Sequence, residues 1–151
     1  MDQVKLFREY TRQLYRNLEN MDRNDCCQCN VNTLQCYIIV EIGRAPGICL
    51  KDLAKQLHVD KSGISRAIEE LVQKDYVIRE PSKSDRRSVV LTLTDIGASH
   101  FNKIESDMYE KFKRVFSNIA KDKKAMVLEA LQIFNEACRK TEDDCCDQGN
   151  V

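Results

Sequence analysis

The chain has 151 residues and a mass of 17.5 kDa, a size typical of one domain or of one protomer in a small oligomer. Its 24 Lys and Arg residues balance 24 Asp and Glu residues, which excludes a strongly basic or acidic tail as the main functional feature. No apolar run approaches the roughly 20 residues of a membrane span, and the first residues lack the apolar stretch of a secretory signal. We therefore expect a cytoplasmic protein with no membrane partner.

Long helices are expected because five Gly and two Pro residues leave few breakpoints in the chain. Apolar residues at three- and four-residue steps predict an amphipathic helix over residues 3–21. A polar connection follows, and a second helix is predicted to begin at Thr33. This helix should end before the Pro- and Gly-containing turn at residues 43–47.

Two short amphipathic segments follow, over residues 50–57 and 61–74, and a tight turn joins them. Their apolar faces, together with Asp60 as a helix cap, predict a helix-turn-helix unit. Two β-prone runs come next, over residues 76–80 and 88–93, with a polar basic loop between them. This order predicts a β-hairpin wing directly after the helix-turn-helix.

The remainder of the chain returns to helical periodicity. Thr94 is placed to cap a helix that ends near Ala120, and Asp122 is placed to cap a last helix to about residue 139, followed by a frayed end. The expected fold class is mainly α with a small β wing: a winged helix-turn-helix with long N- and C-terminal helices. No repeat or linker interrupts the sequence, so we expect a single domain over residues 1–151.

Two short motifs in the chain are specific enough to suggest a family resemblance. The specific ones are the wing sequence Asp85-Arg86-Arg87 and the exit sequence Leu93-Thr94-Asp95-Ile96-Gly97. With them, the chain resembles the multiple-antibiotic-resistance regulator (MarR) family. The resemblance implies a homodimer that binds double-stranded DNA, at an inverted repeat with half-sites about ten base pairs apart. It also implies a DNA-binding unit over about residues 46–93, between dimerisation helices over about residues 3–21 and 95–139.

A modest basic excess lies on this winged unit, where residues 44–91 carry ten Lys and Arg against seven Asp and Glu. Arginines at a hairpin tip suit the negative potential of a narrow minor groove. By the resemblance, the start of the recognition helix meets bases and phosphates, and Gly63 permits a close approach of its backbone. The candidate DNA-binding residues are Lys61, Ser62, Gly63, Ser65, Arg66, Lys83, Asp85, Arg86 and Arg87. A winged helix that binds only protein is the alternative.

Two departures from the family pattern stand in this unit. Gly63 occupies a position where the family often has a hydroxyl residue, which removes one possible contact. Asp75 stands where many members have Gly, and Asp tolerates the left-handed backbone conformation better than most residues.

Five of the eight cysteines form two clusters that are not part of the family's general pattern. They lie in polar segments beside aspartates, and neighbouring cysteines are poor disulfide partners. Thiolates suit soft ions, so a thiolate-bound metal or metalloid, namely zinc, copper or arsenite, is the favoured ligand. The candidate ligands are Cys26, Cys27, Cys29, Cys145 and Cys146.

Two alternative roles for the cysteines stay open. A thiol could instead be oxidised to a sulfenic acid, although the nearby aspartates oppose thiolate formation. Alternatively, the cysteines are structural and the chain responds to a small organic ligand. Cys36, Cys49 and Cys138 lie in helical or apolar runs and are expected to act as small apolar residues.

Together these features predict a dimeric transcription regulator, with repression as the favoured mode. An effector would release the DNA by changing the spacing of the recognition helices, which requires that it bind one dimer geometry better than the other. Catalysis is not expected, because His58 lies in the helix-turn-helix turn and His100 begins a distant helix. The sequence also lacks a phosphate loop and a His-Glu metal motif.

Overall fold

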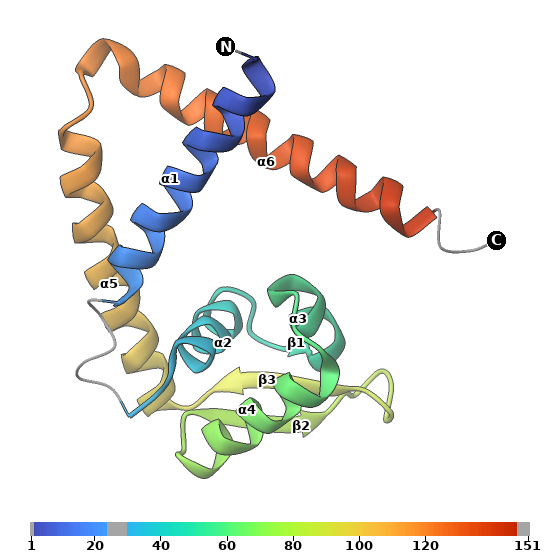
Figure 1. The fold of residues 1–151 in the computed structure, drawn as a ribbon. Helices are drawn as coiled ribbons and strands as arrows, with labels where there is room; N and C mark the ends of the chain where they lie inside the picture. Colours follow the sequence, from blue (N-terminus) through green and yellow to red (C-terminus); the bar gives the residue numbers. More distant parts are fainter. Residues whose placement is uncertain (1, 24–29, 148–151) are drawn as a thin grey trace. The chain divides into compact units, whose positions relative to one another are not determined.

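The structure is a computed structural model that describes the backbone of residues 2–23 and 30–147, and the side chains of residues 2–22 and 30–142. It comprises two compact units, residues 1–108 and 109–151. The first unit contains α1 (Gln3–Arg23), α2 (Thr33–Arg44), β1 (Ile48–Cys49), α3 (Leu50–Leu57), α4 (Lys61–Gln73), β2 (Val77–Pro81) and β3 (Val89–Leu93). Helix α5 (Asp95–Ser117) runs from the first unit into the second, which also holds the 3-10 turn η1 (Lys121–Lys123) and α6 (Lys124–Asp147) (Figure 1).

The core of the first unit lies between α2, α3, α4 and an antiparallel sheet with strand order β1-β3-β2. In the wing hairpin, Val77 pairs with Leu93 and Pro81 pairs with Val89. Fully buried aliphatic side chains from every layer fill the core: Ile38, Ile39, Ile42, Leu53, Ile64, Ile68, Leu71 and Leu91. The predicted fold class, mainly α with a small β wing, is therefore confirmed.

Local capping and left-handed residues explain where these helices begin and end. Asn32 and Gln35 form a reciprocal capping box at the start of α2, as expected for a helix from Thr33. His58 ends α3 in the left-handed conformation, with φ of 52°. The carboxylate of Asp60 then accepts the backbone N–H of Gly63 and caps α4. Asp75, where Gly is common in the family, has φ of 63°, so the expected left-handed conformation is confirmed.

Several boundaries differ from the sequence-based expectations. Strand β1 was not expected, because two residues are too few to produce a periodic pattern and their partner strand lies about 40 residues further along. Asp122 does not cap the last helix; it lies inside η1, whose own N-cap, Ala120, forms no side-chain hydrogen bond. Helix α5 ends at Ser117, and α6 continues to Asp147 through the segment expected to fray.

The three remaining cysteines do not all behave as small apolar residues. Cys36 packs against the core, as expected. Cys49 instead caps α3, because its sulfur accepts the backbone N–H of Asp52 at 3.4 Å. Cys138 lies exposed on α6.

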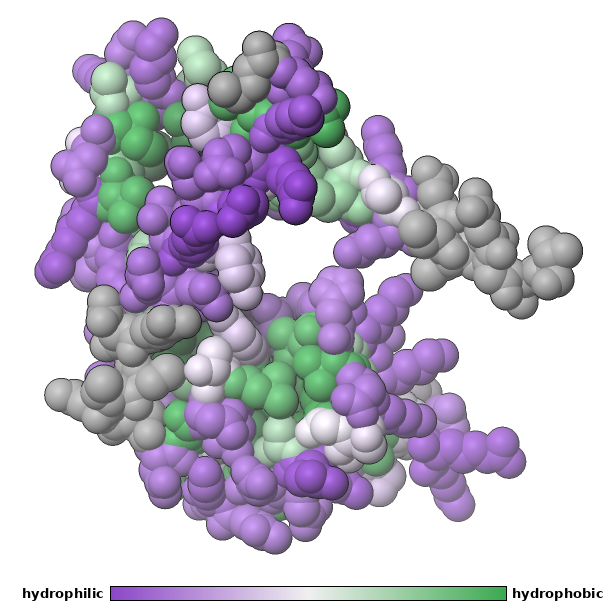
Figure 2. Space-filling view, in the orientation of Figure 1, coloured by the Kyte–Doolittle hydropathy of each residue, from purple (hydrophilic) through white to green (hydrophobic). Residues whose placement is uncertain are grey.

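Large apolar side chains are exposed on the long helices, and Figure 2 shows hydrophobic side chains open to solvent. In the first unit, α1 exposes Val4, Phe7, Tyr10, Leu14, Tyr15 and Leu18. In the second unit, the exposed residues are Tyr109, Phe112, Val115, Phe116, Met126, Leu128, Leu131 and Ile133. Despite this apolar surface, none of the helices among the described residues is long and apolar enough to cross a membrane.

Candidate nucleic-acid interface

The recognition helix α4 divides cleanly into a buried and a solvent-facing side. Ile64, Ala67, Ile68 and Leu71 enter the core, which fixes the opposite face outward. On that outward face Lys61, Ser62 and Arg66 are exposed, and Gly63 and Ser65 are partly exposed. The structure thus brings five candidate residues together in the first two turns of one helix.

Asp60 holds the beginning of this helix. Its carboxylate accepts hydrogen bonds from the hydroxyl of Ser62 and, at 3.2 Å, from the backbone N–H of Gly63. These two bonds, in that order, lower the pKa of Asp60 below its ordinary value of 3.8. A β-carbon at Gly63 would lie 2.9 Å from Oδ1, the other oxygen of the capping carboxylate, so a side chain at this position would press against the cap. The hydroxyl of Ser62 consequently has a partner within the protein.

The wing presents its basic side chains at the tip of the hairpin. Lys83, Asp85, Arg86 and Arg87 are all exposed between β2 and β3. The carboxylate of Asp85 accepts the backbone N–H of Arg87 at 3.0 Å, and its carbonyl accepts the N–H of Ser88. Asp85 therefore shapes the turn through the backbone, and within the described residues neither guanidinium of the tip is in an ion pair.

Two acidic residues on α4 have partners, which reduces their repulsion of a polyanion. Glu69 forms an ion pair with Arg79 of β2 at 3.3 Å. Glu70 accepts a 2.7 Å hydrogen bond from the side-chain amide of Gln35, which is buried at the start of α2. The spacing of Asn32 and Gln35 is the local pattern of a capping box, but it does not indicate that Gln35 is buried or that it bonds to Glu70, because a polar residue in a helical pattern is ordinarily assigned to the solvent face.

The exit motif of the wing joins three elements. The hydroxyl of Thr94 donates to the carbonyl of Asp75 at 2.6 Å and accepts the N–H of Gly97 at 3.0 Å. The backbone N–H of Thr94 also donates to the carbonyl of Tyr76. Gly97 lies so close to Tyr76 that a β-carbon would be 2.0 Å from this same carbonyl oxygen. The end of the recognition helix, the wing and the start of α5 are therefore fixed to one another.

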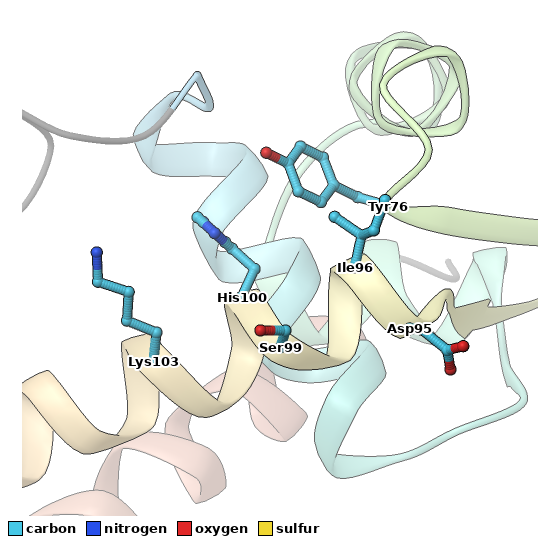
Figure 3. Close-up of a pocket in the computed structure, with 6 residues that line it drawn as sticks. All are labelled: Tyr76, Asp95, Ile96, Ser99, His100 and Lys103. Atoms are coloured by element: carbon cyan, nitrogen blue, oxygen red, sulfur yellow. The ribbon is translucent and has the colours of Figure 1, made fainter.

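A shallow groove with a volume of about 450 Å³ lies beside this junction. Its lining residues are Tyr76, Asp95, Ile96, Ser99, His100 and Lys103. In Figure 3 the rings of Tyr76 and His100 and the amine of Lys103 extend to one side of α5, with Asp95 on the other. The two rings are 5.3 Å apart between centroids.

His100 contributes a buried polar atom to this groove. Its Nε2 atom is buried without a hydrogen bond among the described residues. Burial first, and then the charge of Lys103, lower the pKa of His100 below 6.5, so the neutral imidazole is favoured. The groove therefore offers a neutral ring nitrogen, a phenol and an ammonium group. It was not expected from the sequence, because its residues come from two separate segments.

The predicted cysteine ligands lie outside the described side chains. Cys26, Cys27 and Cys29 belong to the segment before Asn30, and the structure describes Cys145 and Cys146 in the last part of α6 by their backbone alone. Among the side chains that are described, no group of three or more His, Cys, Asp or Glu residues could hold a metal ion. The metal or metalloid site stays a prediction.

The arrangement of a capped recognition helix followed by a basic hairpin defines a winged helix-turn-helix protein. Comparisons with known proteins agree. The MarR family profile matches residues 30–88. The transcriptional regulator BilQ of Clostridium symbiosum is 30% identical over 96 residues, which cover 64% of this chain and 67% of BilQ. The chain belongs to the MarR family of transcription regulators, which are not enzymes.

More distant similarities extend beyond the winged unit. The transcriptional repressor MdtR of Bacillus subtilis is 22% identical over 127 residues, or 84% of this chain and 77% of MdtR. The structure of FabT from Streptococcus pneumoniae in complex with DNA superposes with a TM-score of 0.78 and 19% identity. That superposition covers 91% of this chain and 99% of FabT. The shared fold therefore includes the flanking helices.

Proposed function

We propose that the protein is a homodimeric repressor that binds double-stranded DNA through α4 and the wing. The observation that carries this proposal is the set of exposed cationic side chains at the beginning of α4 and at the hairpin tip. These are Lys61, Arg66, Lys83, Arg86 and Arg87, and none of them is in an ion pair within the described part of the chain. Unpaired cations are costly to gather on one surface unless an anionic partner compensates their repulsion.

The exposed apolar faces of the long helices support the homodimer. Phe7 on α1, Phe112 on α5 and Leu131 on α6 would each be covered by a second copy of the chain. A two-fold dimer presents two recognition helices and therefore reads an inverted repeat. The name of the Bacillus relative, a repressor, supports repression rather than activation.

The DNA-binding role is tested by selecting duplexes from a random library and measuring affinity for the selected site by fluorescence anisotropy. The double variant Arg86→Ala/Arg87→Ala should weaken binding by at least tenfold. It should also reduce the slope of log affinity against log salt by about one for each phosphate that is no longer neutralised. Lys121→Ala/Lys123→Ala removes the same charge from η1, which belongs to the second unit and not to the winged unit, and is the matched control. If both double variants bind equally well, the wing does not contact DNA.

The dimer is tested by analytical ultracentrifugation, which should give twice the 17.5 kDa mass of one chain. Leu131→Asp places a charge on the exposed apolar face of α6 and should shift the equilibrium toward the monomer. A wild-type monomer at micromolar concentration would contradict the proposal.

For the effector, we propose a soft metal or metalloid bound by the two cysteine clusters, such as zinc, copper(I) or arsenite. Support comes from the sequence, because five thiols stand in polar surroundings where an apolar role is unsuitable. Titration of the reduced dimer with each ion should produce sulfur–metal absorbance together with a loss of DNA affinity. Replacement of all five residues by Ser should abolish both signals, whereas Cys138→Ser, an exposed thiol of α6, should preserve them. Loss of DNA affinity on mild peroxide treatment, without metal binding, would favour the oxidant-sensing alternative.

The groove beside Tyr76 favours a second candidate effector, a small organic anion. An aromatic carboxylate could place its ring near Tyr76 and Ile96 and its charge near Lys103, where the Nε2 of His100 also lacks a partner. Calorimetric titration with benzoate should show binding that Lys103→Met weakens. Equal, undetectable binding of benzoate to the wild type and to Lys103→Met, by calorimetry and by a shift in Tm, would contradict a benzoate-like ligand in this groove.

A further inference from the structure

Gln35 is unusual because its polar side chain is buried. It is the one buried polar or charged residue among those the structure describes, with 1% of its surface exposed. A buried amide without partners costs about 1–3 kcal/mol, so such a residue persists where its hydrogen bonds are made. Here its side chain is bonded in three directions.

The bonds of Gln35 connect α2 to the last part of the recognition helix. Its amide nitrogen donates to Glu70 at 2.7 Å. Its amide oxygen accepts the backbone N–H of Asn32 at 3.1 Å and the ammonium group of Lys74 at 3.4 Å. The same ammonium group donates to the carbonyl of Asn30 at 2.6 Å. Asn30, Asn32, Gln35, Glu70 and Lys74 therefore form one connected network, which we call the Gln35 clamp.

The clamp supplies directional bonds that the core between these helices lacks. Ile38 and Ile42 of α2 and Ile64 and Ile68 of α4 are fully buried aliphatic side chains, and their attraction is non-directional. An aliphatic interface tolerates small rotations or shifts of α4 along α2. A hydrogen bond weakens steeply with distance and angle, so the clamp fixes the register of the two helices.

We propose that Gln35 is a positioning residue for DNA recognition, and that the clamp transmits the position of Asn30 to α4. This inference rests on the proposed function, because it concerns the geometry with which α4 meets DNA. Gln35 itself faces the core and touches no DNA. Its bond to Glu70 and the bond from Lys74 to Asn30 hold the C-terminal part of α4, while Asp60 organises its other end. A displacement of the Asn30 carbonyl would then act on α4 through Lys74.

The test begins with Gln35→Leu in the full-length dimer, on the duplex obtained by random selection. Leu fills a similar volume and leaves Glu70, which is exposed, free to be hydrated, so the fold should be retained. We expect affinity to fall about tenfold, a size typical of positions that act through others. The dimer mass and the salt slope should stay unchanged, because no phosphate contact is removed. Affinity within twofold of the wild type would overturn the proposal.

Two further variants keep the test decisive if Gln35→Leu does not fold. Lys74→Met acts on a partly exposed residue and should lower affinity at an unchanged salt slope; a slope reduced by about one would identify Lys74 as a phosphate contact and overturn its role in the clamp. Gln35→Glu sets two carboxylates against each other and should abolish binding. Adding Glu70→Gln to it restores an amide–carboxylate pair and should recover affinity; a double variant no better than Gln35→Glu would also overturn the proposal.

Failure of this inference is distinguishable from failure of the proposed function. If Arg86→Ala/Arg87→Ala lowers affinity while the clamp variants do not, the wing binds DNA and the clamp does not position α4. If the wild-type dimer selects no duplex at all, the proposed function is wrong, and the clamp proposal is wrong with it.

Discussion

Replacement of Gly97 by Ala tests whether the junction at the start of α5 is as close as the structure shows. The new β-carbon would lie 2.0 Å from the carbonyl oxygen of Tyr76 and 3.3 Å from the β-carbon of Leu93. Since the obstacle at 2.0 Å is backbone rather than the end of a flexible side chain, α5 or the turn at Tyr76 must move by more than about 1 Å to reach ordinary contact distance. The bond from the N–H of Thr94 to that carbonyl is then also strained.

These opposing effects leave a net cost. Overpacking costs about 1–3 kcal/mol and the weakened hydrogen bond about 1 kcal/mol, while Ala regains about 1 kcal/mol of helix propensity over Gly. We expect a destabilisation of about 2 kcal/mol, which lowers Tm by about 4–8 °C in a chain of this length. Calorimetry at a fixed protomer concentration measures it, with the exposed Ser99→Ala of the same helix as control, expected within about 0.5 kcal/mol of the wild type. An unchanged Tm in Gly97→Ala would refute the close approach of α5 to Tyr76.

Three further predictions concern the same region. Thr94→Val removes a hydroxyl that donates to Asp75 and caps α5, and should lower the free energy of unfolding by about 1–2 kcal/mol in urea titrations. Asp75→Val should cost about 1–2 kcal/mol by the same assay, because a β-branched residue resists a φ of 63°, whereas Asp75→Gly should match the wild type. For His100, burial and Lys103 lower the folded-state pKa below the unfolded 6.5, so the unfolded chain binds protons first as the pH falls. Stability should therefore decline as the pH is lowered through 6.5 toward the folded pKa, and His100→Phe should remove this decline in thermal melts.

The winged unit could be predicted from the sequence because its determinants are local. The apolar periodicity of residues 61–74 predicts the buried face of α4, and Asp60 is a strong cap immediately before it. The wing is predicted by two runs of alternating apolar and polar residues around a polar loop. The hairpin that joins these runs sets their register, in which Val77 pairs with Leu93 and Pro81 with Val89. Because the buried face of α4 is predicted, the opposite face of this helix is predicted to point outward.

The features that escaped prediction depend on partners distant in the sequence. Strand β1 exists because Ile48 pairs with Leu91, and two residues carry no period of their own. Gln35 is buried because Glu70, 35 residues away, accepts its amide. The groove at Tyr76 depends on α5 returning to the turn that ends α4. Strand β1 was too short, and Gln35 too polar, for a local pattern to predict their structure. The groove forms only when its two chain segments come together.

The turn at residues 74–76 joins the locally determined winged unit to partners that are distant in the sequence. The ammonium group of Lys74 donates to the carbonyl of Asn30. The carbonyl of Asp75 accepts the hydroxyl of Thr94, and the carbonyl of Tyr76 lies close to Gly97. Contacts from the segment before α2 and from the start of α5 are therefore made by three consecutive residues. The recognition helix ends on one side of this turn and the wing begins on the other. A displacement of Asn30 or of the start of α5 would therefore act on the residues that join α4 to β2, and both parts of the proposed DNA-binding surface would be affected together.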